Sequence, residues 1–112
     1  MTRSELDLLK GTLDVLILRT LAKQEMHGYA VSRSIHERTR GVLTVEDAAL
    51  YQSLHRLERR GHVTARWGRS ENNRRAKFYA LTERGRRQLD EETDSWRSYV
   101  DAVSRVLGPD TV

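Results

Sequence analysis

The sequence predicts a mainly α-helical protein with a small β-hairpin, a winged helix-turn-helix followed by a C-terminal dimerisation helix. Apolar residues recur every three or four positions up to Leu57, which is the period of amphipathic helices. The period changes to two between Val63 and Leu81, as in paired strands, and becomes helical again after Thr82. Three helices, a hairpin and a further helix follow one another in the order of a winged helix-turn-helix domain.

The composition indicates one soluble domain. At 112 residues, with 38% hydrophobic and 32% charged residues, the chain suits amphipathic helices around one small core. It has no apolar run that could span a bilayer and no apolar block of a signal peptide. Because it contains no cysteine, disulfides and thiolate metal sites are excluded, and we expect a cytoplasmic protein without a cofactor.

Leucine and isoleucine at helical spacing predict the first helix. It starts at about Ser4 or Thr12 and ends at Lys23, and Gly11 is a point where it could be split. Residues 24–27 are predicted as a turn.

The second helix is predicted over residues 28–40, with Gly41 in the position of a C-cap. Its inward residues are Tyr29, Val31 and Ile35.

The third helix is predicted to begin after Thr44, where residues 44–47 resemble a capping box, and to end at Arg60 before Gly61. Its buried stripe is Leu50, Leu54 and Leu57. The residues away from this stripe are Gln52, His55, Arg56 and Arg59.

The change of period predicts a hairpin. One strand spans residues 63–67, residues 68–73 form a polar turn, and the second strand runs over residues 75–81 with alternation through Phe78. The turn and returning strand carry Arg74, Arg75 and Lys77.

The last helix is predicted from the N-cap Thr82 to about Leu107, with Gly85 as a weak point. Its apolar positions alternate by four and three residues, as in a coiled-coil seam with one polar interruption at Thr93. The predicted interface residues are Leu89, Trp96, Val100, Val103 and Leu107. We therefore expect a DNA-binding domain over residues 1–81 and a dimerisation helix with a short tail over residues 82–112.

Positive charge is concentrated in the middle of the chain. Lys and Arg number 20 against 16 Asp and Glu, a net charge of +4. The basic residues of this middle region are Arg56, Arg59, Arg60, Arg66, Arg69, Arg74, Arg75 and Lys77. A local basic surface favours phosphate binding, and the third helix would enter the major groove with the hairpin as a wing. A solvated helix face would also explain the basic residues of the third helix taken alone.

The sequence gives no support to enzyme or metal sites. It has no phosphate-binding glycine loop, nucleophile elbow or zinc-protease motif. The four histidines lack carboxylate pairs at ligand spacing, and His27 is interpreted as a structural turn residue.

Four segments resemble the PadR family of bacterial transcriptional regulators. They are residues 9–14 (LKGTLD), 26–29 (MHGY), 50–58 (LYQSLHRLE) and 74–82 (RRAKFYALT). Two departures are Gln52, where the family commonly has Pro, and His62, where it has an aliphatic residue. The resemblance implies a homodimer joined through the last helix and parts of the first, most often a repressor released by a small molecule. It also implies the compact subgroup with one C-terminal helix, in which a Trp such as Trp96 stacks on flat aromatic ligands; alternatively, Trp96 only fills the dimer core.

The expected DNA contacts are Tyr51 to a phosphate, Gln52 and Arg56 to base edges, and the wing to neighbouring phosphates. The complete predicted set is Tyr51, Gln52, His55, Arg56, Arg74, Arg75 and Lys77. The alternatives are a winged helix that binds a protein instead of nucleic acid, and a small-molecule sensor without sequence-specific DNA binding.

Overall fold

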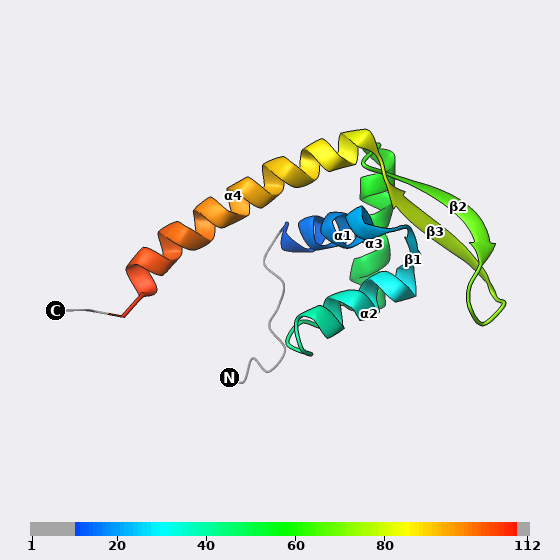
Figure 1. Ribbon diagram of the computed structural model, residues 1–112, viewed down its shortest axis with the longest axis horizontal. Helices are drawn as coiled ribbons and strands as arrows, with labels where there is room; N and C mark the ends of the chain where they lie inside the picture. The colour runs from blue at the N-terminus through cyan, green and yellow to red at the C-terminus, as the bar shows by residue number, and fades with distance from the viewer. Residues whose placement is uncertain (1–10, 110–112) are drawn as a thin grey trace.

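The computed structural model describes residues 11–109, which form four helices and a three-stranded antiparallel sheet (Figure 1). The helices are α1 (Thr12–Lys23), α2 (Gly28–Arg38), α3 (Asp47–Arg59) and α4 (Glu83–Leu107). The strands are β1 (Met26–His27), β2 (Val63–Arg69) and β3 (Arg75–Leu81). This arrangement confirms the predicted helical class with its hairpin. The alternative start at Ser4 lies outside the described residues.

The core lies where α1, α2 and α3 meet one face of the sheet. The leucine stripe of α3 is fully buried, as predicted, because its three members share the helix face turned to α1 and α2. Each such side chain contributes about 1.5–3 kcal/mol through removal from water. The other buried apolar residues are Leu13, Ile17, Leu18, Leu21, Val31, Ile35, Val45, Val63, Tyr79 and Leu89. Tyr79, and not Phe78, supplies the aromatic ring of β3 to this core.

The end of α2 differs from the sequence prediction. The helix stops at Arg38, two residues early, because Arg40 and Gly41 both adopt positive φ angles, of 54° and 80°. The N–H of Gly41 donates to the carbonyl of His36 at 2.8 Å, as in a Schellman motif. A similar motif ends α3, where Gly61 has a φ of 78°.

The predicted capping box before α3 is wrong. The N-cap is Glu46, and no side chain caps the helix there. The Thr44 hydroxyl instead lies 3.4 Å from Nδ1 of His36, beside the end of α2.

The predicted turn at residues 24–27 contains the short strand β1. Met26 pairs with Tyr79 and His27 pairs with Phe78 on β3, which becomes the central strand. Two residues are too few to show a period in the sequence. Nδ1 of His27 also accepts a hydrogen bond from the N–H of Ala30 at 3.2 Å, so this histidine is the N-cap of α2.

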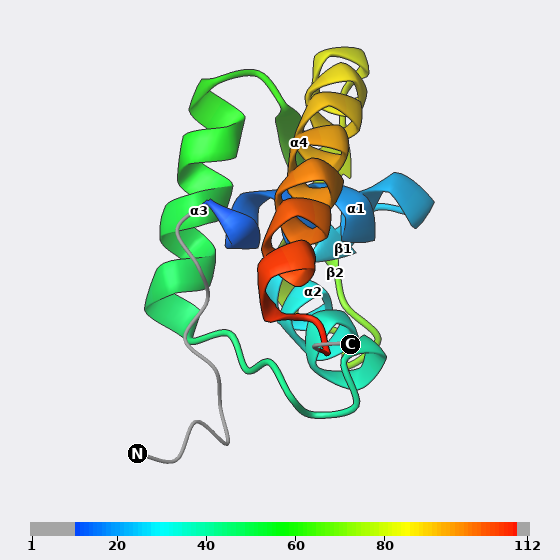
Figure 2. The ribbon, with the colours of Figure 1, turned by 90° about the vertical axis from the view of Figure 1, so that its left-hand side faces the viewer.

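The C-terminal end of helix α4 and the wing lie at opposite ends of a molecule 59 Å long (Figure 1), and in Figure 2 this end of α4 comes toward the viewer. Only the first part of α4 packs on the body, where Gly85 lies against the corner between α3 and β2. A Cβ at Gly85 would lie 2.0 Å from the carbonyl oxygen of His62. The last buried residue of the helix is Leu89. Residues 92–99 still face the start of α1, and the remaining turns of α4 project outward. Within residues 11–109 no helix is long and apolar enough to cross a membrane.

Candidate nucleic-acid interface

The exposed face of α3 carries three of the predicted contact residues. Tyr51, Gln52 and His55 are exposed, on the side of the helix opposite the leucine stripe. Hydroxyl, amide and imidazole groups can each donate and accept hydrogen bonds. This face therefore offers polar groups that suit base edges and phosphates.

The start of α2 lies directly beside this face. A Cβ added at Gly28 would lie 2.7 Å from both Cε1 and the hydroxyl oxygen of Tyr51, so only glycine allows the tyrosine ring to lie there. The predicted inward position of Tyr29 is wrong, because this ring is 63% exposed. The guanidinium carbon of Arg33 lies 5.8 Å from the centre of the Tyr29 ring.

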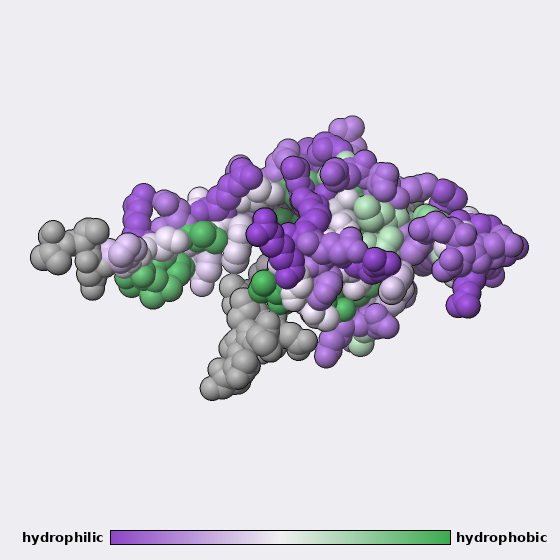
Figure 3. Space-filling model, turned by 60° about the horizontal axis from the view of Figure 1, so that its bottom comes forward, coloured by the Kyte–Doolittle hydropathy of each residue, from purple (hydrophilic) through white to green (hydrophobic). Residues whose placement is uncertain are grey.

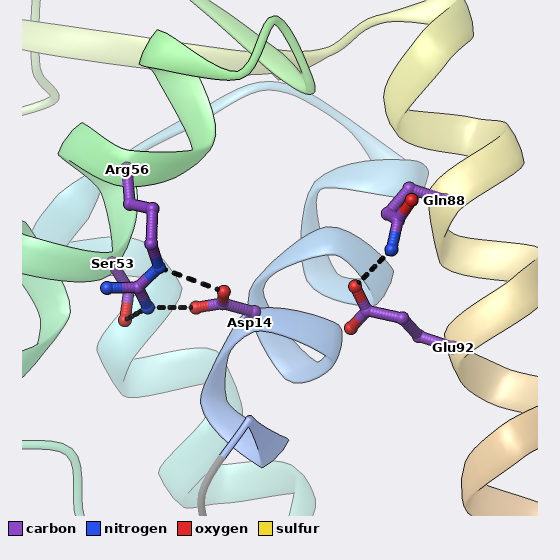
Figure 4. A network of polar contacts seen from close by, with 5 residues as sticks. All are labelled: Asp14, Ser53, Arg56, Gln88 and Glu92. Carbon is purple, nitrogen blue, oxygen red and sulfur yellow. Dashed lines mark hydrogen bonds and ion pairs between the residues drawn. The ribbon is translucent and has the colours of Figure 1, made fainter.

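Arg56 does not join the exposed face. Its guanidinium forms two hydrogen bonds with Asp14 on α1, at 2.7 and 3.3 Å, and a third with the Ser53 hydroxyl at 3.1 Å (Figure 4). The hydrogen bonds with Asp14 raise the pKa of the Arg56 guanidinium above its ordinary value. The base contact expected for Arg56 is therefore withdrawn, because its planar fork is already used to fasten α3 to α1.

The wing divides its cations into paired and unpaired groups. Lys77 pairs with Glu58 on α3 at 3.4 Å, and Arg66 forms a two-pronged ion pair with Glu25 before β1. Within residues 11–109, by contrast, no carboxylate pairs with Arg74 or Arg75, and both are exposed. Arg69, the other exposed wing cation without a carboxylate partner in these residues, donates instead to the carbonyl of Asn73 at 3.3 Å. Arg74 and Arg75 are therefore the wing residues whose charge and N–H groups are most available to an anion.

A broad open hollow of about 1450 Å³ brings the start of α2, the face of α3 and the wing together. Among the predicted contacts, its walls include Tyr51, His55, Arg74, Arg75 and Lys77. The predicted contacts did not include the two exposed aromatic residues of the same walls, Tyr29 and Trp67. The sequence did contain an indication for Trp67. Val63 and Ala65, at the preceding alternate positions of β2, contribute to the core, so a large ring further along the same strand is left at the surface.

The predicted seam on α4 is partly a core and partly an exposed stripe. Leu89 is 2% exposed in the single chain, so it has no surface left for a partner and is removed from the predicted interface. Beyond it, Trp96, Val100 and Leu107 remain exposed, and Val103 is half-buried. Tyr99 and Val106 enlarge this apolar surface, whose green patch on the projecting helix contrasts with the purple wing in Figure 3.

A second, smaller pocket of about 480 Å³ lies between α1 and α4. Its aromatic wall is Trp96 with Tyr99, whose ring centres are 5.9 Å apart, and Glu92 contributes a carboxylate. Its remaining lining is Gly11, Thr12, Val15 and Ser95. This volume is within the usual range for small-molecule sites. Neither this pocket nor any other part of residues 11–109 contains a cluster of His, Asp or Glu that could hold a metal ion.

Several known proteins are similar to this chain. The model of the transcriptional regulator PadR-like family matches residues 17–91. A Lysinibacillus sphaericus protein described as uncharacterized protein X is 32% identical over 97 residues, covering 87% of this chain and 89% of that protein. A PadR family transcription regulator from Clostridium difficile is 26% identical, with a TM-score of 0.75, over 88% of this chain and 100% of that one. Bacillus subtilis PadR, solved in complex with operator DNA, is 25% identical, with a TM-score of 0.67, over 76% of this chain and 47% of that one.

Proposed function

Because the chain belongs to the PadR-like family of transcriptional regulators, we propose that it is a ligand-responsive repressor that binds operator DNA as a homodimer in the cytoplasm. The observation that carries the DNA-binding part is the hollow where the polar face of α3 meets two unpaired wing arginines. Its walls also contain three acids, of which Glu25 and Glu37 are already paired with arginines. The aromatic rings and unpaired arginines of these walls suit a nucleic acid better than an apolar protein partner.

The two parts of this surface take different roles. In the proposed complex, α3 lies in the major groove and Gln52 reads a base edge, since its amide can form two hydrogen bonds with adenine. Tyr51 and His55 lie beside it on the exposed face and contact the backbone or a neighbouring base. Arg74 and Arg75 bind phosphates, which fix the position of the protein and carry no base information.

The exposed stripe of α4 supports the homodimer. Trp96, Val100 and Leu107 follow one another on a helix that projects away from its own core. Exposure of such an apolar stripe to water is unfavourable. In a two-fold symmetric dimer, the same stripe on a second copy of α4 would cover it. Two copies also place two recognition helices for a roughly palindromic operator.

The pocket between α1 and α4 supports a flat aromatic effector. Trp96 and Tyr99 provide ring faces, and stacking adds about 0.5–1.5 kcal/mol beyond area burial. The same helix α1 is fastened to α3 through Asp14 and Arg56. An effector that shifts α1 against α4 therefore also acts on the recognition helix. A tenfold loss of DNA affinity requires about 1.4 kcal/mol of coupling.

Binding-site selection from a random duplex library, followed by titration of the selected duplex, tests the DNA-binding part. We expect Gln52→Ala to cost roughly 1–3 kcal/mol at one or two base positions. Arg75→Ala weakens binding to every sequence. The matched control is Arg105→Ala, because Arg105 is an exposed residue of the last turn of α4 and is paired with Asp101. That end of α4 lies far from the wing (Figure 1). Absence of DNA binding by the wild type would instead favour a protein-interaction module.

Fluorescence titration with flat cationic dyes tests the effector part. Trp67→Phe leaves Trp96 as the only tryptophan. We expect saturable quenching of Trp96 emission that accompanies weaker operator binding. Dye binding, followed by the fluorescence of the dye itself, should be lost in Trp96→Ala. A Trp96→Ala protein that dimerises and binds the dye unchanged would show that the pocket is not the effector site.

A further inference from the structure

Trp67 forms an unusual contact on the wing. Its ring is 57% exposed, at the outer end of a face whose inner residues join the core. The guanidinium carbon of Arg75 lies 4.3 Å from the centre of the indole. Other arginine and lysine side chains over aromatic rings in the described residues lie 5.1 to 5.8 Å away. Arg75 is paired across the hairpin with Arg69, so Trp67 is its diagonal neighbour and the strand register itself builds the stack.

This contact differs chemically from those of the neighbouring cations. Glu58 and Glu25 hold Lys77 and Arg66, and each carboxylate cancels the charge that it positions. A ring face attracts a guanidinium without neutralising it. Stacking also uses the flat face of the guanidinium and leaves its in-plane N–H groups free to donate. The Arg75 side chain is thus fixed in place while its charge and donors remain available.

We propose that Trp67 is a positioning residue for DNA binding, which holds the Arg75 guanidinium ready to grip a backbone phosphate. This inference rests on the proposed function. An unsupported arginine loses much of its rotamer freedom when it binds a phosphate. A stacked arginine has already lost part of that freedom in the free protein, so binding is favoured.

The matched variants are Trp67→Leu and Trp67→Phe. Both keep a large apolar side chain, but only phenylalanine keeps an aromatic face. Because a phosphate contact does not depend on sequence, the probe is a short mixed-sequence DNA duplex. We expect Trp67→Leu to weaken binding by about fivefold, as loss of an exposed cation–π contact does, and Trp67→Phe to recover most of the loss.

Salt dependence and a double-mutant cycle separate positioning from direct contact. Arg75→Ala lowers the salt slope by about one for each wing bound, because a phosphate contact is lost. Trp67→Leu keeps the slope, since Arg75 still reaches the phosphate. In the Arg75→Ala background, Trp67→Leu has no further effect. A loss that persists undiminished in that background, or equal losses in the leucine and phenylalanine variants, would overturn the proposal.

A measurement without DNA tests the stack itself. In the wild-type protein, the side-chain protons of Arg75 are expected to show upfield NMR shifts from the indole ring current, which disappear in Trp67→Leu. Unchanged thermal unfolding shows that the fold is retained, and Trp67→Thr, which suits a strand, replaces the leucine variant if that protein does not fold. A wild type that binds no duplex refutes the proposed function. A wild type and Trp67→Leu protein that bind equally refute only the role of Trp67.

Discussion

Removing the carboxylate of Asp14 is expected to destabilise the whole domain. The Asp14 side chain is 12% exposed and that of its partner Arg56 is 36% exposed, so the pair lies between a surface and a buried ion pair. Surface pairs contribute about 0–1 kcal/mol, and breaking a buried pair costs about 3–5 kcal/mol. We therefore expect Asp14→Asn to lower the free energy of unfolding by about 2 kcal/mol, because Arg56 stays half-buried without its partner.

Urea and thermal unfolding at one fixed protomer concentration measure this loss. A decrease of about 2 kcal/mol corresponds to roughly 10 °C in Tm for a chain of this length. The control is Glu37→Ala, which breaks the exposed Arg33–Glu37 pair on α2 and should cost about 0.5 kcal/mol or less.

Two outcomes would refute this account of the pair. One is a loss in Asp14→Asn no larger than that of the Glu37→Ala control. The other is a changed base preference in binding-site selection with the double variant Asp14→Leu and Arg56→Met. That double variant removes both charges, and replacement of a buried ion pair by apolar residues of similar volume is often neutral or stabilising. It should therefore fold and select the same bases as the wild type, whereas a changed preference at one base position would show that Arg56 reads DNA.

Three further changes test other parts of the structure. Hydrogen bonding to Arg66 lowers the pKa of Glu25 below its ordinary value of 4.5. The stability that the Glu25–Arg66 ion pair contributes is therefore present above pH 4.5 and is lost as the pH falls through the lowered pKa. An NMR titration should find the Glu25 pKa lowered in the wild type and ordinary in Arg66→Ala. Val103→Asp should give a monomer in sedimentation at micromolar concentration, because it places an unpaired charge in the α4 stripe. Gly85→Ala should destabilise by about 2 kcal/mol in thermal unfolding, despite the better helix propensity of Ala, because the new Cβ collides with the His62 carbonyl.

The sequence predicted those features that repeat along the chain. The leucine stripe of α3 and the alternation of the hairpin are local patterns, and glycines and capping residues mark most of the element ends. The pair of Asp14 and Arg56 could not be predicted in this way, since the partners are 42 residues apart and neither belongs to an apolar period. Leu89 was misjudged for a related reason. The seven-residue spacing of α4 continues unchanged from the part that packs on the core to the part that projects, so spacing alone does not show where the core ends.

Under the proposed function, ion pairing limits how many basic residues of the middle region can bind DNA phosphates. The sequence places eight there, and the structure joins three of them, Arg56, Arg66 and Lys77, to carboxylates. A phosphate could recruit these three only by displacing an acid that would then repel the DNA. The other five have no carboxylate partner within residues 11–109. If about three of these five bind phosphates in each protomer, the slope of log K against log salt for a dimer is roughly −5, and if all five bind it is roughly −9. Recruitment of all eight would make it roughly −14. Titration of a selected operator at several salt concentrations therefore shows whether the three ion pairs persist in the complex. A slope near roughly −14 would mean that the ion pairs open on binding. A slope near zero would show that the protein makes no phosphate contacts.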